Sequence, residues 1–261
     1  MLFDMLTLYP IKTPLISPRD DVVPLILKSA EDNGLQVMDG DIMAVSSKVL
    51  SIASGNIIRL SDVEPSQRAL EYAGKYGMDP RLVEVVLREA DEVLGGIKGI
   101  LLTVKDGMLM PNAGVDTSNV MKGYVVLLPR NPFRTADEVR RRLVEETGRN
   151  VGVIVVDSRV MPMRRGTVGV AVAVSGFRPV RDFRGRRDLY GNVLKYTLHS
   201  VADDLASAAH LLMGECCEMV PAVLVRGAPV EAVEHPVDAS EMTVPRDVCL
   251  YMASLNASGS P

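Results

Sequence analysis

The 261-residue chain has no tryptophan, only three cysteines and no long uninterrupted apolar run. Cys216 and Cys217 are adjacent and Cys249 stands apart, so no C-x-x-C pair supports a zinc site or a disulfide framework. No apolar stretch approaches the ~20 residues of a membrane-spanning helix, and Asp4 lies where a signal peptide carries basic residues. These absences predict reduced thiols, a cytoplasmic location and no membrane contact.

Aromatic residues make up only 4% of the chain and the formal net charge is −4. Few stacking side chains and a negative balance predict no nucleic-acid partner, although arginines gather between 159 and 187 and leave a local basic site open. The length suits one large domain or two modest ones. We expect residues 1–255 to form one unit, which allows two subdomains without a defined boundary, and residues 256–261 to form a disordered tail.

Hydrophobic periodicity predicts a mixture of strands and helices. The expected strands cover residues 41–45, 49–52, 57–60, 151–156, 168–174 and 222–226, with a hairpin turn at Gly55-Asn56. One helix should open at Asp79-Pro80, another should run from the capping pair Thr135 and Glu138 to Gly148, and a third should span about Gly191 to Met213. Because no regular βαβ rhythm is present, the pattern predicts an α+β fold with mixed or antiparallel sheets. No Walker A or GxGxxG motif occurs.

Two aspartates with neighbouring hydroxyls are the main chemical signal. Asp116 lies in the segment Asn112–Asn119, and Asp157-Ser158 ends the apolar run 151–156. Carboxylate and hydroxyl oxygens are hard ligands that suit Mg²⁺ or Mn²⁺, and the arginines that follow suit a phosphate or carboxylate. Together they predict metal-assisted phosphate chemistry. The alternatives are that Asp157 caps the next element, that Asp116 lies in a turn and that Arg164 and Arg165 lie in a solvated turn.

Five motifs in a fixed order carry a resemblance to a known family. They are Asn112-Ala-Gly-Val-Asp-Thr-Ser-Asn119, Asp157-Ser158 after its strand, Arg164-Arg-Gly-Thr-Val-Gly-Val-Ala171, Gly185-Arg-Arg-Asp-Leu-Tyr-Gly191 and Leu211-Leu-Met-Gly-Glu215. In this order they resemble the coenzyme F-420-0:L-glutamate ligase family. Thr13–Ile16 and the 41–55 segment are similar to that family's N-terminal part, and the resemblance extends to about Gly227.

The resemblance implies a ligase that uses GTP and Mg²⁺ or Mn²⁺ to add L-glutamate, through γ-linkages and an acyl phosphate, to a deazaflavin coenzyme. It also implies an intertwined homodimer. Asp116 and Asp157 become the catalytic positions, and with Ser158 and Glu215 they become the metal-site positions. The implied GTP site comprises Thr13, Pro14, Leu15, Ile16, Ser47, Lys48, Asn119, Met213, Gly214, Glu215, Cys216, Cys217, Glu218, Met219 and Val220.

The chain departs from the family pattern at three places. Ile52 replaces a lysine and Ser54 an acid, Cys216-Cys217-Glu218 replaces Gly-Gly-Asp, and Val160-Met161-Pro162 replaces Gly-Arg-Pro. We expect Lys48 to take the place of the missing lysine, because positions 48 and 52 share a face of a strand. The changes leave two alternatives open: a same-fold amide ligase for another carboxylate acceptor or nucleotide, and a non-catalytic nucleotide or phosphate binder. The retained acids argue against the binder, since clustered carboxylates repel without a metal.

Other reactive side chains favour plainer roles. His199 and His210 are expected on one helix, in packing or at the surface, Cys216 and Cys217 as loop thiols, and Asp188 as a cap. The apolar strand 167–174 and the helix at 191–213 offer more apolar surface than a small sheet covers. An obligate homodimer is therefore expected.

Overall fold

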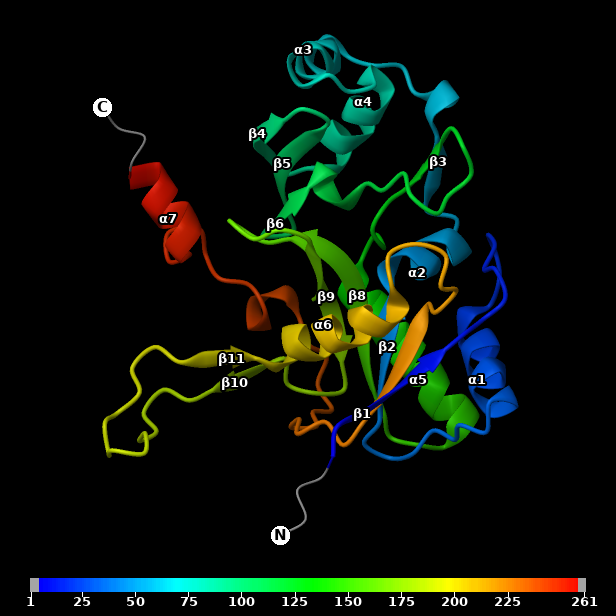
Figure 1. The fold of residues 1–261 in the computed structure, drawn as a ribbon, viewed down its shortest axis with the longest axis vertical. Helices are drawn as coiled ribbons and strands as arrows, with labels where there is room; N and C mark the ends of the chain where they lie inside the picture. The colour runs from blue at the N-terminus through cyan, green and yellow to red at the C-terminus, as the bar shows by residue number, and fades with distance from the viewer. Residues whose placement is uncertain (1–4, 258–261) are drawn as a thin grey trace. The chain divides into compact units, whose positions relative to one another are not determined.

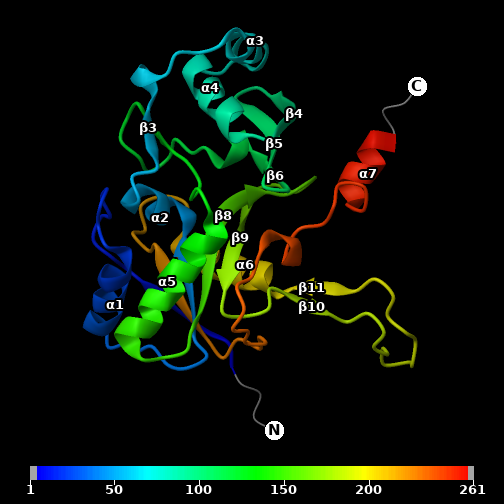
Figure 2. The same cartoon turned by 180° about the vertical axis from the view of Figure 1, so that it is seen from behind.

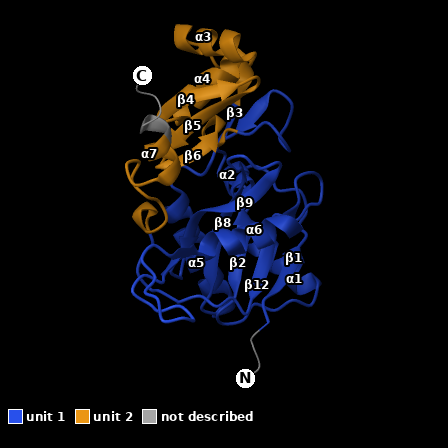
Figure 3. Cartoon of the chain, turned by 60° about the vertical axis from the view of Figure 1, so that its left-hand side comes forward, with its two compact units in different colours: residues 1–58, 116–237 blue, residues 59–115, 238–261 orange. Residues whose placement is uncertain are grey.

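The structure is a computed structural model that describes residues 5–257, which form two compact units (Figures 1 and 3). Unit 1 contains the chain up to Ile58 and Asp116–Val237, and unit 2 contains Arg59–Val115 and the segment from Asp238 onward. The sequence allowed two subdomains, and the structure places their boundaries. Of the expected disordered tail, residues 258–261 lie outside the described residues. Residues 256 and 257 instead end a helix, so the prediction of disorder is wrong for them.

A mixed five-stranded sheet forms the centre of unit 1 and confirms the α+β class. Its order is β1 (Thr7–Ile11), β12 (Ala222–Arg226), β2 (Ile42–Ser46), β8 (Gly152–Val160) and β9 (Thr167–Ser175). Neighbouring strands are antiparallel except β2 and β8, which run parallel. The predicted strands at 151–156, 168–174 and 222–226 are confirmed. Their continuous apolar runs are explained by burial on both faces of the sheet.

Helices cover both faces of this sheet. Helix α6 (Val201–Met213) packs against β8 and β9 on the face turned to the viewer in Figure 1. Helix α5 (Pro132–Thr147) contacts the same two strands on the opposite face, where it also contacts α1 (Val22–Asp32) (Figure 2). None of the helices within residues 5–257 is long and apolar enough to cross a membrane.

The segment after β2 is a helix, so the predicted strand at 49–52 is wrong. Helix α2 (Ser47–Ala53) buries Ser47, Leu50 and Ser51, a spacing of three and four residues that is helical rather than alternating. Gly55 does not turn a hairpin. It has a left-handed backbone at the end of α2, and the short strand β3 (Ile57–Arg59) that follows pairs with β7 (Tyr124–Val126).

Two other helix starts differ from the prediction. Helix α5 begins at Pro132 with Asn131 as its cap, because Pro at the first position and an Asn side chain before it outweigh the Thr135 and Glu138 pair. Its end at Gly148 is confirmed. Helix α6 begins at Val201, not near Gly191. The preceding residues form an arm in which β10 (Val180–Asp182) pairs with β11 (Leu198–Ser200), so His199 lies on a strand and not on the helix of His210.

Unit 2 has two helices, an antiparallel three-stranded sheet and a C-terminal helix. These elements are α3 (Gln67–Tyr76), α4 (Pro80–Glu89), β4 (Glu92–Ile97), β5 (Ile100–Lys105), β6 (Met108–Pro111) and α7 (Leu250–Ala257), with 3-10 turns at Leu60–Asp62, Asn112–Gly114 and Ala239–Glu241. The Asp79 cap with Pro80 at the first helical position is confirmed. Asn112 and Ala113, which open the first motif, hold this unit together: the Asn112 Oδ1 accepts from the Leu101 N–H, and the Ala113 N–H donates to Thr103.

Gly169 allows α6 to lie directly on β9. A Cβ atom at this position would lie 2.3 Å from His210 Cβ and 2.5 Å from the Ala206 carbonyl oxygen. The Ser207 hydroxyl donates to the Gly169 carbonyl at 2.7 Å across the same contact. The alternation of valine with glycine and alanine in β9 is therefore explained by the close approach of this helix.

We predict that Gly169→Ala destabilises the protein, because neither the helix backbone nor a Cβ atom can move aside cheaply. The expected loss is about 1–3 kcal/mol, the usual cost of overpacking, measured as a lower midpoint of denaturant unfolding. Gly74→Ala in α3 is the matched control, since its Cβ would meet nothing within 4 Å. The control should be neutral or stabilising by about 0.5–1 kcal/mol. Equal midpoints for the Gly169 variant and the wild type would contradict the close packing.

Candidate active site

The two predicted aspartates lie at the end of the parallel strand pair in unit 1. The register that places Ser46 beside Val156 brings the next residues, Ser47 and Asp157, together. The Ser47 hydroxyl donates to Asp157 Oδ1 at 2.9 Å. The edge where parallel strands end is also where open sheets of this kind bind ligands.

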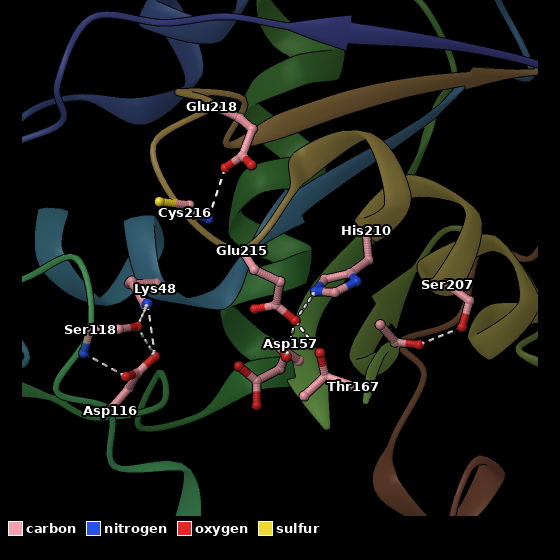
Figure 4. Close-up of polar contacts among 12 residues, drawn as sticks. Lys48, Asp116, Ser118, Asp157, Thr167, Ser207, His210, Glu215, Cys216 and Glu218 are labelled. Atoms are coloured by element: carbon pink, nitrogen blue, oxygen red, sulfur yellow. Dashed lines mark hydrogen bonds and ion pairs between the residues drawn. The ribbon is translucent and has the colours of Figure 1, made fainter. Parts of the chain in front are cut away.

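Lys48 joins the second aspartate to this edge. Its ammonium lies 2.7 Å from Asp116 Oδ2 and donates to the Ser118 hydroxyl at 2.8 Å (Figure 4). Burial raises the pKa of Asp116. The hydrogen bonds from Lys48 and Ser118 lower it by more than burial raises it, so the pKa lies below its ordinary value of 3.8. Adjacent residues of α2 therefore link the two carboxylates, Ser47 to Asp157 and Lys48 to Asp116.

Asp157 is also held by a buried arginine. A register shift between β8 and β9 at Val155/Val156 comes immediately before it, and such bulges redirect the side chains that follow. Arg159 lies two residues on, on the same side of the strand, is only 5% exposed and donates to Asp157 Oδ2 at 3.1 Å. Both oxygens of Asp157 are thus engaged by protein groups.

Glu215 lies on the other side of β8 from Asp157. Ser158, the next strand residue, donates to Glu215 Oε1 at 2.9 Å, and the Thr167 hydroxyl donates to the same oxygen. His210 Nε2 lies 3.3 Å from it. Figure 4 shows Glu215 between His210 and Thr167, with the Lys48, Asp116 and Ser118 group beside them. The site therefore has two oxygen-rich groups, one around the aspartates and one around Glu215.

The loop after α6 is a tight turn that needs its glycine. Gly214 has a φ of 73°, and a Cβ there would lie 2.2 Å from Glu218 Cδ. The Cys216 N–H donates to Glu218 Oε2 at 2.8 Å and lowers the pKa of this carboxyl. The loop thus keeps a close turn although Cys216 and Cys217, both exposed, occupy the positions where the family has glycines.

Two further hydrogen bonds bring the remaining predicted segments to this loop. The Asn119 amide donates to the Cys216 carbonyl at 2.8 Å, and the Thr13 N–H donates to the Met219 carbonyl at 3.2 Å. Thr13 and Ile16 are buried, whereas Leu15 is 76% exposed. Segments 13–16, 47–48, 116–119, 157–158 and 213–220 are thereby connected within unit 1.

The donor chemistry of the site fits a hard divalent cation. Across residues 5–257 no group of three or more His, Cys, Asp or Glu side chains is placed to hold one ion. Alternation along β8 explains this, because Asp157 points to one side of the strand and Ser158, which binds Glu215, to the other. Mg²⁺ usually takes one or two carboxylates, water and substrate phosphate oxygens and not a complete protein cage. Asp116, Asp157, Ser158 and Glu215 could supply such partial sets.

Sequence reasoning missed three side chains that contact the predicted ones. Arg159 was noted only as one of several arginines, His210 was assigned to packing or the surface, and Thr167 was a motif residue without a role. Thr167 and His210 contact Glu215 from other elements, whereas Arg159 lies two residues after Asp157 on the same strand. Only their places in or directly beside the motifs could have suggested them. Arg164 and Arg165 are exposed in the β8–β9 connection. Asp188 accepts from the Tyr190 and Asn192 N–H groups in the arm and caps no helix.

Comparison with known proteins gives a consistent result. The family model described as F420-0:gamma-glutamyl ligase matches residues 10–227. The chain is 41% identical to the coenzyme F420:L-glutamate ligase of Methanothermobacter thermautotrophicus over 91% of this chain and 95% of that protein. It is 46% identical to the ligase of the same name from Methanopyrus kandleri, over 83% and 84% of the two chains. For that from Archaeoglobus fulgidus the identity is 43%, over 83% and 85%.

We predict that Lys48→Met raises the pKa of Asp116, because the effect of burial is then no longer offset by the ammonium. Carboxyl-carbon NMR of labelled aspartate should show the shift. Lys122→Met, which replaces an exposed lysine in the following loop, is the control and should leave the pKa of Asp116 unchanged.

The same contact has a consequence for stability. A carboxyl whose pKa is lowered in the folded state stabilises the protein at pH values above its unfolded-state pKa. The stability advantage of the wild type over Lys48→Met should therefore shrink as pH falls below 3.8. An unshifted Asp116 would contradict the contact.

Proposed function

The chain belongs to the F420-0:gamma-glutamyl ligase family and is an amide-forming ligase, and from this premise we propose that it adds L-glutamate to the deazaflavin coenzyme F420-0 with GTP and a divalent metal. The proposal includes an acyl phosphate on the acceptor carboxylate. The observation that carries it is the joining of five separate segments at the end of the β2–β8 pair by the hydrogen bonds of Ser47, Lys48, Asn119, Thr13 and Glu215.

Lys48 and the loop after α6 are proposed to bind the nucleotide. The Lys48 ammonium has three donor hydrogens, and its contacts with Asp116 and Ser118 use two of them. The third is available for a phosphate oxygen. Ile52 follows Lys48 by four residues on α2, so the two share a face of the helix, although not of a strand as expected. Lys48 can therefore serve the position from which the family's lysine is missing.

A bound Mg²⁺ or Mn²⁺ would neutralise phosphate charge and stabilise the leaving diphosphate. Asp116, Asp157, Ser158 and Glu215 are the residues proposed to hold it. Asp157 needs fixed neighbours for that role, and Ser47 and Arg159 supply them from two elements. The low pKa of Asp116 keeps its carboxylate ionised at neutral pH.

The proposed reaction has two transfers. An oxygen of the acceptor carboxylate attacks the γ-phosphorus of GTP, the bond to the β-phosphate oxygen breaks, and GDP leaves. The glutamate amine then attacks the acyl carbon, phosphate leaves with the electron pair of the C–O bond, and the amine loses a proton as the amide forms. Fixed charges around the site place these groups, and such positioning provides much of the acceleration in phosphoryl transfer.

We predict that Asp157→Asn abolishes metal-dependent GTP turnover in the presence of L-glutamate and the acceptor, measured as GDP release and as glutamate mass added to the coenzyme. Because Asp157 faces the buried Arg159, the variant should also lose stability. Asp116→Asn keeps the test decisive, since Lys48 is partly exposed and the loss of its partner costs less. Asp39→Asn, an exposed ion-pair residue, is the control. Normal turnover in both site variants would refute the assignment, and ATP in parallel assays would test nucleotide choice.

We also propose a homodimer, supported by the arm that carries β10 and β11. The connection between these two strands exposes large apolar side chains: Leu189 is 100%, Tyr190 91% and Tyr196 89% exposed. In Figures 1 and 2 the arm extends away from the sheet of unit 1. Exposed apolar clusters of this kind mark interaction surfaces, and a second copy of the chain is the partner that the family resemblance implies.

Light scattering at micromolar protein should therefore give twice the chain mass, and the unfolding midpoint should rise with concentration because folding and association are coupled. Leu189→Asp combined with Tyr190→Asp should shift the mass toward that of the monomer. Ile97→Asp replaces an apolar residue of unit 2 that is 70% exposed and should leave the mass unchanged. A wild type of monomer mass with a concentration-independent midpoint would refute the dimer.

A further inference from the structure

Polar groups from three different elements converge on one oxygen of Glu215. Ser158 on β8 donates to Oε1 at 2.9 Å, Thr167 on β9 donates to the same atom, and Nε2 of His210 on α6 lies 3.3 Å from it (Figure 4). Within residues 5–257 no side chain hydrogen-bonds or ion-pairs with Oε2, the other oxygen. An exposed glutamate in a loop does not need three partners around one oxygen. Because these partners hold Oε1 in place, they also fix the direction in which Oε2 points.

His210 is fixed independently of Glu215. Its Cβ packs against Gly169, where no other residue type would allow α6 to lie so close. The Nε2 atom is buried and makes no hydrogen bond of good geometry among the described residues. Buried polar atoms are nearly always satisfied, and Glu215 Oε1 is the acceptor that lies within reach of it. The imidazole and the carboxylate are thus in close polar contact, at an Nε2–Oε1 distance of 3.3 Å.

Strand geometry fixes the hydroxyl donors in the same way. Ser158 pairs with Gly169 across β8 and β9, and Thr167 lies two residues before Gly169, so both side chains stand on the face that α6 covers. Position 169 has no side chain to separate them from the helix. The absence of a side chain at 169 therefore allows two hydroxyls and an imidazole to meet at Glu215.

We propose that His210 and Thr167 are positioning residues, which turn the Glu215 carboxylate so that Oε2 is presented to a divalent cation. This inference rests on the metal-dependent function proposed above. Groups behind a metal ligand commonly set its orientation, and their loss typically costs 10–100-fold in metal affinity. Neither residue is expected to touch substrate or metal itself.

The test is Mn²⁺ binding to the full chain, with and without GTP, followed by the electron paramagnetic resonance signal of free Mn²⁺. His210→Leu and Thr167→Val should each raise the Mn²⁺ dissociation constant by about 10–100-fold. His210→Gln and Thr167→Ser keep a donor and should stay within a few-fold of the wild type. In turnover assays the two non-donor variants should show a raised KM for Mn²⁺ and recover most of kcat at saturating metal, a pattern that general destabilisation does not produce.

Ser207→Ala is the matched control, because it removes a hydrogen bond from the same helix–strand contact without touching Glu215. Its Mn²⁺ affinity should equal that of the wild type. Thr167 is exposed, so its variants remain informative if His210→Leu fails to fold. Wild-type affinity in both His210→Leu and Thr167→Val would overturn the positioning role alone. No Mn²⁺ binding by the wild type, with or without GTP, would overturn the metal-dependent function and this proposal with it.

Discussion

The parallel pairing of β2 with β8 is the constraint on which the candidate site depends. Parallel neighbours cannot be joined by a tight turn, and here the connection between them contains residues 59–115 of unit 2 as well as α2 and α5. The register of this pair places Ser47 at Asp157, and Lys48 then reaches Asp116. Val153, Ile154 and Val155 are fully buried between the helices of both faces, and this packing holds β8 in the centre of unit 1.

Close backbone approach is the second requirement, and two glycines provide it. Gly169 brings α6 onto β9 and so places His210 above Ser158 and Thr167. Gly214 leaves room for the Glu218 side chain, which folds back over the turn after α6 and accepts from the Cys216 N–H. This turn fixes the backbone direction at Glu215, the first residue after Gly214. The close contact behind the site therefore explains why polar groups from three elements meet at one carboxylate oxygen.

Two ion pairs set the charge balance around the aspartates of the site. Lys48, on the first turn of α2, pairs with Asp116. Arg159 performs the corresponding task for Asp157 from within the protein. Asp116 and Asp157 are thus each paired with a cation of the protein, so their expected repulsion does not count against a non-catalytic binder.

The sequence by itself determined the elements whose signals are local and strong. The apolar runs at 151–156 and 222–226, the Asp79-Pro80 helix start and the Gly148 stop are confirmed, because burial on both faces, caps and left-handed backbone act over a few residues. The motif resemblance supplied the segments of the site. Tertiary structure decided the rest. Residues 47–53 fold as a helix and 191–200 as an arm, since short segments take the conformation that their neighbours allow. The contacts of Thr167 and His210 with Glu215 were out of reach of sequence reasoning, because they join residues on different elements that only packing brings together. Arg159 lies two residues after Asp157 on one strand, so alternation along the strand could have suggested that pair.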